Sequence, residues 1–414
     1  VSAKECPTET FYMFSIGFTR WPVVFGTLQA LQAACGDDMF QDVGCHASLL
    51  QMAVSIPGAK NISMSSSTAV STERSALESL LQRAGKECPK ATERCLSSLT
   101  DLRLHVWPYV QEETNWSGSA WLPEGMDSEQ AIGDVSCFEE KAMYYRHIWK
   151  SAGHSVFENL EKVSTNFSQD GLSYAQFCER YNSVDGKDHV GFTFVRHPIA
   201  RFISGYAEIE GRARDGNPTY ADLATTLNDY PVGSPRRAAA FFREFLRTGV
   251  NRDGHVKPQL EFMIPNAGCS VPMGFIGKTE SMEDDWTRMF GVHQCNLSSP
   301  FDQSLGLHPN DEQDKIAMET VLGWTGTSTM KPNGGSHNNT TPSAVMLSQA
   351  SADVRAIVTA LQENGSRYLR ALCWLLLADF ASFRFDMPAA CRSGLLYKST
   401  FAFLRAERAS STAA

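Results

Sequence analysis

The chain has 414 residues, of which 43% are hydrophobic and 20% are charged, and its formal net charge is -9. This composition is typical of a globular protein, and the length exceeds that of one typical domain of about 100–200 residues. The acidic balance argues against a protein that binds nucleic acid over its whole surface, because such binding needs an excess of Lys and Arg. The longest apolar runs, Phe11–Phe18 and Ala371–Phe380, are well below the roughly 18 residues of a membrane-spanning helix. We therefore expect neither a nucleic-acid partner nor a membrane span within this sequence.

Cysteines and glycosylation signals favour an oxidising compartment. The eleven Cys include no CxxC pair, which argues against a zinc ribbon or a thioredoxin-type site. Six of them precede residue 140, where disulfides would stabilise a region with few strand signals. Sequons begin at Asn61, Asn115, Asn166, Asn296, Asn338, Asn339 and Asn364. We expect a disulfide-bonded glycoprotein of the Golgi or secretory-pathway lumen. A signal peptide or membrane anchor would then precede Val1.

Residues 1–138 are predicted to form a Cys-rich, mostly helical accessory region of unknown role. Helical spacing of apolar residues occurs in Trp21–Ala34, in Ser75–Arg83 and in a segment beginning at Pro89. The last of these would carry Cys88 and Cys95 on one face of a helix. Small polar residues dominate Ser63–Thr72, which we expect to be an exposed loop.

From residue 139 onward, short apolar runs alternate with helical stretches, which predicts βα units and a parallel sheet. The predicted strands are Tyr144–Trp149, Val190–Val195 and Met273–Ile276, and the predicted helices are Val156–Val163, Ile199–Glu210 and Ser351–Phe385. Residues 324–342 are rich in Gly, Ser, Thr, Asn and Pro, which predicts a mobile loop. We therefore predict a domain at 139–395 and a C-terminal tail at 396–414.

The first segment with chemical character is Lys150-Ser-Ala-Gly-His-Ser-Val156, between a predicted strand and a predicted helix. Backbone N–H groups at such a helix N-terminus bind phosphate. Gly153 allows close approach of the backbone, Lys150 supplies a positive charge and Ser155 a hydroxyl. A Walker A loop is excluded, because its Lys follows the second Gly. Taken alone, the segment is equally compatible with an ordinary strand-to-helix turn.

The second segment, Arg196-His-Pro-Ile-Ala-Arg-Phe-Ile-Ser-Gly-Tyr206, follows the next predicted strand. Pro198 suits the first turn of the helix that comes after it. Arg196 and Ser204 can converge on one anion, and a guanidinium with a hydroxyl at a helix start suits a phosphate monoester. The alternative is an Arg-capped surface helix.

In this order and spacing, the two segments resemble the cofactor motifs of sulfotransferases that use 3'-phosphoadenosine 5'-phosphosulfate. The second segment is similar to that of the membrane-bound Golgi carbohydrate sulfotransferases, including the heparan, chondroitin and dermatan types. His255-Val-Lys-Pro-Gln259 and Gly274–Trp286 resemble further segments of that group. The resemblance extends over about 145–385 and leaves the residues before 140 unassigned.

The resemblance implies a P-loop-NTPase-like three-layer α/β fold with a central parallel sheet. It also implies a set of residues around the 5'-phosphosulfate: Lys150, Ser151, Ala152, Gly153, His154, Ser155 and Val156. Lys150 would further polarise the bridging oxygen as the sulfuryl group leaves, and Arg196 with Ser204 would hold the 3'-phosphate. Sulfuryl transfer is an in-line displacement in which positioning and charge stabilisation dominate, so no metal is expected.

A general base must accept the proton of the acceptor hydroxyl, and His255 is the preferred candidate by motif and chemistry. His154 is a rival, because it stands where the family usually has Thr or Ser. A carboxylate such as Glu208 is a second rival, and a base outside this set stays open. The segment Gly277-Lys-Thr-Glu280 is either a turn with a helix cap or a cofactor contact.

Residues 230–260 contain more bases than acids, which favours an anionic acceptor such as a glycan. The bases are Arg236, Arg237, Arg243, Arg247, Arg252 and Lys257, and the acids are Glu244 and Asp253. A solvated helix face is the alternative, because Arg243 and Arg247 can flank Glu244.

Three function classes follow from these observations. The preferred one is an enzyme that transfers sulfate from the phosphosulfate donor to a hydroxyl, most simply on a carbohydrate. The second is a catalytically inactive glycan-binding or scaffold protein that keeps the nucleotide pocket. A nucleotide kinase is disfavoured by the missing Walker A order. The sequence leaves the oligomeric state open.

Overall fold

The computed structural model describes residues 67–124, 132–136, 142–163, 190–248, 253–265, 272–292, 300–302 and 351–392. The chain divides into two compact units, Val1–Ile62 and Ser63–Ala414, and every described residue lies in the second. The helix predicted at Trp21–Ala34, the loop predicted at 324–342 and the tail at 396–414 lie outside the described residues. None of the helices described here is both long and apolar enough to cross a membrane.

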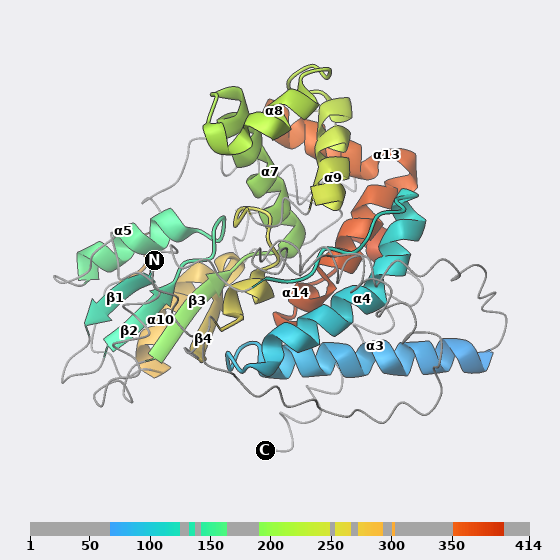
Figure 1. Cartoon of the computed structure of the whole chain (residues 1–414). Coiled ribbons are helices and arrows are strands. Elements are labelled where there is room, and N and C mark those ends of the chain that lie inside the picture. The colour runs from blue at the N-terminus through green and yellow to red at the C-terminus, as the bar shows by residue number, and fades with distance from the viewer. Residues whose placement is uncertain are drawn as a thin grey trace, which may run out of the picture. The chain divides into compact units, whose positions relative to one another are not determined.

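A mixed four-stranded sheet has the order β1-β2-β3-β4 (Figure 1). Its strands are β1 (Ile132–Ser136), β2 (Ala142–Arg146), β3 (Val190–Val195) and β4 (Met273–Lys278). β2, β3 and β4 are parallel, as predicted, whereas β1 pairs antiparallel with β2 and was not predicted. β2 ends at Arg146, so the strand predicted through Trp149 is three residues too long. Those three residues begin the loop that leads into the site.

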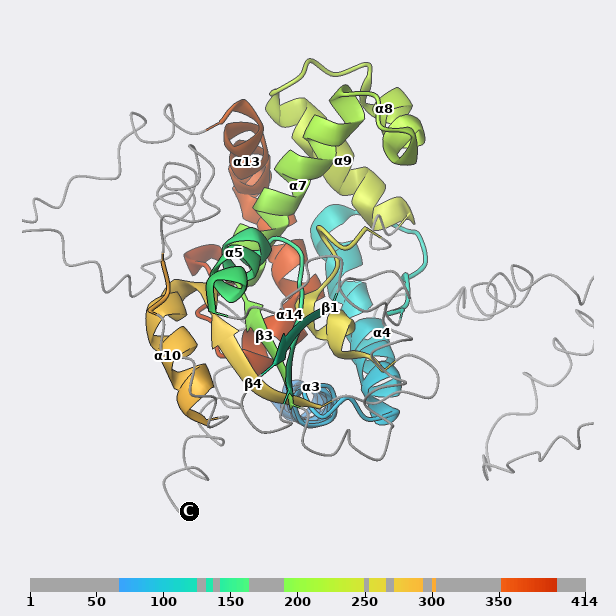
Figure 2. The same cartoon turned by 90° about the vertical axis from the view of Figure 1, so that its left-hand side faces the viewer.

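One face of the sheet packs against two helices, α5 (Gly153–Val163) and α10 (Met282–Val292) (Figure 2). Phe192 and Phe194 lie two apart on β3 and point to this face, as the period of a strand requires. Trp286 of α10 packs against Phe194, with ring centroids 6.3 Å apart. This aromatic core fixes the sheet edge from which the candidate phosphate loops leave.

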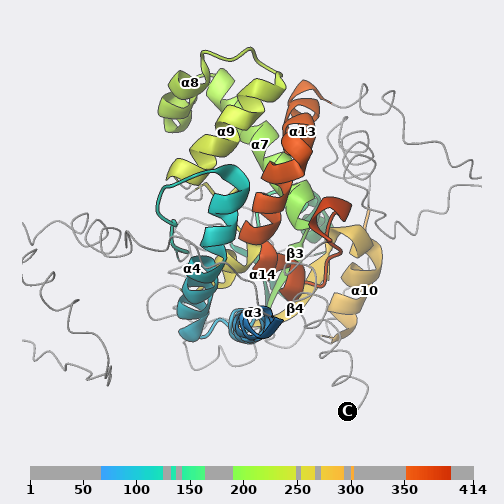
Figure 3. The same cartoon turned by 90° about the vertical axis from the view of Figure 1, so that its right-hand side faces the viewer.

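A second core joins three long helices, α7 (Pro198–Arg214), α9 (Pro235–Thr248) and α13 (Ala352–Leu375) (Figure 3). The short elements η3 (Pro218–Tyr220) and α8 (Ala221–Leu227) connect α7 to α9. Phe241, Phe242 and Phe245 of α9 are fully buried at three-and-four spacing, and each packs against Phe202 of α7. α7, which follows β3 in the chain, is thereby fixed against α9.

The helices α3 (Ser67–Glu87) and α4 (Arg94–Thr114) form a hairpin (Figure 1). The helix predicted around Ser75–Arg83 is confirmed, but residues 67–72 are helical too, so the predicted loop is wrong there. Buried Leu77, Leu81 and Ala84 lie on one face of α3, and this tertiary packing outweighs the poor helix propensity of its Ser and Thr.

The connection between these helices corrects a second prediction. Pro89 begins a turn rather than a helix, and α4 starts only at Arg94. Ala91 has a left-handed backbone with a φ of 48°, which reverses the chain direction. Cys88 and Cys95 form a disulfide that closes this turn. α4 then packs along α13, so these helices share the second core.

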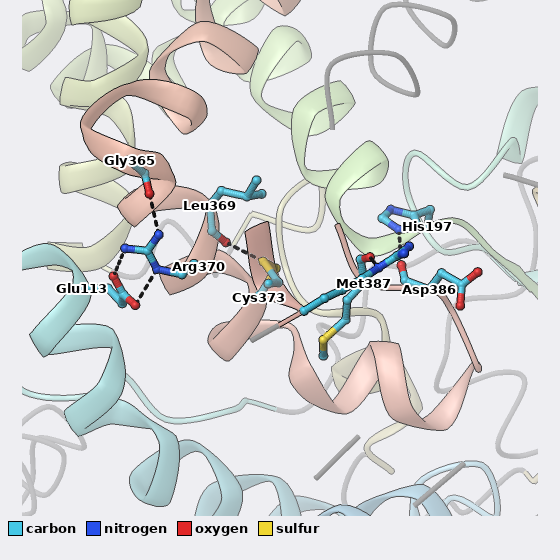
Figure 4. Close-up of a disulfide and its surroundings, with 10 residues drawn as sticks. Glu113, His197, Gly365, Leu369, Arg370, Cys373, Asp386 and Met387 are labelled. Atoms are coloured by element: carbon cyan, nitrogen blue, oxygen red, sulfur yellow. Dashed lines mark hydrogen bonds and ion pairs between the residues drawn. A yellow bond between two sulfur atoms is a disulfide. The ribbon is translucent and has the colours of Figure 1, made fainter. Parts of the chain in front are cut away.

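The second disulfide among the described residues joins Cys373 of α13 to Cys391 of η7 (Ala389–Cys391) (Figure 4). It closes a segment that contains α14 (Leu377–Ser382) and the chain around Asp386. Beside it, Arg370 of α13 forms an ion pair with Glu113 of α4 at 2.7 Å. The prediction of disulfides is confirmed for these two pairs, and the other seven cysteines lie outside the described residues.

Candidate active site

The loop between β2 and α5 contains the predicted Lys-first segment. Lys150 and Ala152 have left-handed backbones with φ values of 64° and 58°. Such conformations cost non-glycine residues about 1–3 kcal/mol and cluster at functional sites. Gly153 begins α5, and a Cβ there would overlap the ring of His147. The loop is therefore tightly wound against the start of a helix, where backbone N–H groups favour an anion.

Lys150 reaches α7 through an ion pair. Its Nζ lies 2.9 Å from Glu208 Oε2, and Arg212 Nε lies 2.6 Å from the other carboxylate oxygen. Partial burial raises the pKa of Glu208, but the bonds from Lys150 and Arg212 outweigh it and hold that pKa at about 2. A carboxylate with so low a pKa is a weak base, which disfavours Glu208 as the general base.

One stripe of α7 faces the site from its first turn onward. Arg201, Ser204, Gly205 and Glu208 are spaced three and four apart, so they share one side of the helix. A Cβ on Gly205 would overlap the backbone carbonyl of His255, so only glycine lets that segment lie against α7. Ser204 is half-buried on this stripe. The stripe brings the predicted Lys150 and His255 regions together beside Ser204.

His255 is buried within a chain of hydrogen bonds. Its Nδ1 lies 2.5 Å from Asp253 Oδ1, and the Tyr220 hydroxyl donates to Asp253 Oδ2 at 2.5 Å. Burial raises the pKa of Asp253, but the bonds from His255 and Tyr220 outweigh it and lower that pKa overall. The ionised carboxylate accepts a hydrogen bond from Nδ1–H, which leaves Nε2 as the nitrogen of the ring that can accept a proton. The ring of Trp149 lies against His255 at 4.5 Å between centroids.

Arg201 lies within the second segment but turns into the protein. Its guanidinium donates to the carbonyl oxygens of Trp149 (2.8 Å), Gly254 (2.5 Å) and Lys257. Burial lowers the pKa of Arg201 to about 10, which still leaves it charged at neutral pH. Arg201 therefore joins α7 to the two segments that hold Lys150 and His255.

The remaining predicted phosphate-binding residues are divided between the loop interior and its surface. Ser151 is fully buried, and its N–H and hydroxyl donate to Ile148 and to the Gln259 side chain. Ser151 thus shapes the loop, and its predicted contact with the 5'-phosphosulfate stays a prediction. Ser155 and Val156 are buried in the first turn of α5, whereas His154 is exposed. Arg196 is half-buried just after β3.

The turn between β3 and α7 is held by two further residues. The backbone N–H of His197 donates to Glu280 Oε1 at 2.7 Å. The ring Nε2 of His197 donates to the carbonyl of Asp386 at 2.9 Å (Figure 4). Glu280 follows β4 in η6 (Thr279–Ser281), and burial raises its pKa. Glu280 thus anchors the turn before α7, and a cofactor contact of the Gly277–Glu280 segment stays a prediction.

Acid should destabilise this site through two histidines, the half-buried His147 and the fully buried His197. Burial lowers the pKa of both His147 and His197 from about 6.5 to about 3, so the folded protein keeps them neutral. The unfolded chain takes up protons below about pH 6.5, so the free energy of unfolding should fall as the pH drops from 6.5 towards 3. At pH 5 we expect a loss on the order of 2 kcal/mol per histidine relative to pH 7.5, measured by urea unfolding.

The variant His147→Phe tests this assignment, because it keeps an aromatic ring beside Tyr145 and Phe157 and removes the titrating group. It should show a shallower pH dependence than the native protein. An unchanged slope between pH 7.5 and 5 would contradict the role given to His147.

The predicted basic stretch does not present six charges on one surface. Arg237 is buried in an ion pair with Glu210 at 2.5 Å, and Lys257 is buried as well. Arg247 is paired with Glu244 at 2.6 Å. Arg236 and Arg243 are exposed on α9. Arg252 lies outside the described residues. An anionic acceptor therefore stays a prediction of the sequence.

Several residues of the site were missed as functional residues by sequence reasoning. Asp253 stands two residues before His255, and this Asp-Gly-His spacing was a usable signal. Tyr220 and Asp379 carried no such signal, since both approach the site from distant parts of the chain. No group of three or more His, Cys, Asp or Glu that could hold a metal occurs in the part of the chain that the structure describes.

The candidate site coincides with a family match. Residues 134–301 match the Sulfotransferase family. The matched segment contains Lys150, Arg196, Ser204 and His255, together with all four strands except the first two residues of β1. The match supports a sulfotransferase family and sulfuryl transfer in general, and the mixed α/β architecture with three parallel strands is consistent with a P-loop-like fold. No curated protein and no solved structure matches this chain.

Proposed function

We propose that this protein transfers the sulfuryl group of 3'-phosphoadenosine 5'-phosphosulfate to a hydroxyl group of a carbohydrate. The observation that carries the proposal is the meeting of Lys150 and the Asp253–His255 pair on one stripe of α7, inside the segment that matches the sulfotransferase family. The same stripe bears Ser204, and the turn before α7 bears Arg196. A cation and the groups that we propose as the base and as a second phosphate site therefore lie on neighbouring elements.

The roles follow from the chemistry of these groups. His255 Nε2 would accept the proton of the acceptor hydroxyl, and Asp253 would stabilise the imidazolium that forms. Lys150 would neutralise the charge that develops on the leaving phosphate. Its bond to Glu208 must open or lengthen for this contact, so Glu208 competes with the donor for Lys150. Arg196 and Ser204 would bind the 3'-phosphate.

The acceptor and the compartment are inferred from the sequence motif and from the disulfides. The carbohydrate acceptor and the Golgi location follow from the resemblance of the Arg196–Tyr206 segment to the carbohydrate sulfotransferases. The two disulfides agree with an oxidising lumen. Asn115 of the second sequon is exposed at the end of α4, where a glycan would be accommodated.

Titration calorimetry with 3',5'-adenosine bisphosphate tests the donor site. The native protein should bind it, and Arg196→Ala should weaken binding by about 10–100-fold, because a charge-assisted phosphate contact is lost. Arg94→Ala is the matched control, since Arg94 is exposed at the start of α4. Absence of binding by the native protein would overturn the proposal.

Labelled sulfate donor and a panel of desulfated glycans then distinguish an enzyme from a scaffold. Transfer of label to a glycan is expected. Tight nucleotide binding without transfer to any glycan or simple hydroxyl acceptor would favour the inactive scaffold instead.

A further inference from the structure

Gln259 lies at the start of η5 (Gln259–Met263) and connects the two candidate phosphate loops. Its side chain is fully buried, and its amide oxygen accepts bonds from Ser151 Oγ (3.1 Å) and from the backbone N–H of Arg196 (2.8 Å). Its amide nitrogen donates to the carbonyl of Arg196 at 2.8 Å. One side chain thus holds the loop after β2 and the loop after β3.

Gln259 is itself fixed from the opposite side. The buried carboxylate of Asp379, on α14, accepts the backbone N–H groups of Gln259 and Leu260 at 2.8 and 2.9 Å. Two residues further on, Glu261 forms a buried ion pair with Arg103 of α4 at 3.1 Å. η5 is therefore anchored to two helices outside the sheet, and Gln259 extends from this anchor to both loops.

We propose that Gln259 is a positioning residue that sets the spacing between the 5'-phosphosulfate loop and the 3'-phosphate turn. The inference rests on the proposed function, since it assumes a donor with phosphates at both ends. A ligand held at two ends gains affinity when the second contact forms without further ordering of the protein. Gln259 supplies this order by fixing both loops before the donor arrives.

Only an amide meets the chemical requirements at this position. The hydroxyl of Ser151 and the backbone N–H of Arg196 need an acceptor, and the carbonyl of Arg196 needs a donor. A carboxylate would place a second acceptor against the Arg196 carbonyl and add negative charge near a phosphate site. A thioether would fill the same space and lose all three bonds.

The test is titration calorimetry of the Gln259→Met variant with two probes, 3',5'-adenosine bisphosphate and 5'-AMP. Loss of three hydrogen bonds should weaken bisphosphate binding by about 10–100-fold and 5'-AMP binding by less than about threefold. The preference for the two-ended ligand should therefore collapse. Gln82→Met, an exposed position on α3, should leave both dissociation constants unchanged.

The readouts separate positioning from folding. A merely structural role would lower the fraction of binding-competent protein, and thus the stoichiometry, without changing the Kd of the competent molecules. Gln259→Glu is the second variant should Gln259→Met fail to fold, and it should also lose the preference. Native Kd values in the folded variants, or equal weakening of both probes, would overturn the inference. Failure of the native protein to bind the bisphosphate would instead overturn the proposed function.

Discussion

The variant His255→Ala should lower kcat for sulfuryl transfer by about 10²–10⁴-fold while leaving the Kd for 3',5'-adenosine bisphosphate within about twofold of native. The reason is the geometry at His255, whose Nδ1 is held by Asp253 and whose Nε2 is left as the proton acceptor. The base acts on the acceptor hydroxyl, so nucleotide binding should not depend on it. Single-turnover kinetics and calorimetry measure the two quantities separately.

A matched control is available on α4. His105 is also paired with a carboxylate, that of Glu73 at 3.1 Å, but it lies away from the two phosphate loops. His105→Ala should leave kcat unchanged. If His255→Ala retains near-native turnover, the base is another group, and exposed His154 becomes the next residue to test.

The second large effect is expected on stability. Arg201→Met should lower the free energy of unfolding by about 3–5 kcal/mol, because it leaves the buried carbonyls of Trp149, Gly254 and Lys257 without their donor. Asp379, whose charge lies near Arg201 in the same buried region, would lose a compensating cation. Denaturant unfolding monitored by Trp fluorescence measures the change.

The control for this variant is Arg74→Met. Arg74 is paired with Glu78 on the surface of α3, and its loss should cost less than about 1 kcal/mol. A folded Arg201→Met variant with native stability but weakened nucleotide binding would show that Arg201 is a phosphate ligand rather than a structural residue.

The N-terminal helices supply part of the support for the site. α4 contacts η5 through the Arg103–Glu261 pair, and the carbonyl of Pro89, in the turn before α4, accepts a hydrogen bond from the backbone N–H of Met273, the first residue of β4. β1 also lies before residue 139 and pairs with β2. Residues on both sides of the boundary predicted at 138 thus contribute to one core.

Local sequence determined the parts of this protein in which neighbours along the chain decide the outcome. The apolar run Val190–Val195 and the Pro-initiated helix after it were predicted correctly, because period and helix-start chemistry act over a few residues. The Lys150 and Arg196 segments were recognised for the same reason. Each places its chemical groups within one strand, turn and helix.

Tertiary structure decided the roles that depend on distant partners. The hydroxyl of Ser151, in the predicted donor loop, donates to the side chain of Gln259, which lies 108 residues away. Arg201 turned inward because three buried carbonyls from other segments needed a donor. Such pairings depend on which buried polar groups the fold brings together, and no local pattern encodes them. The acidic total of -9 averages over the basic stretch, and only the fold showed that three of its six bases are buried or paired.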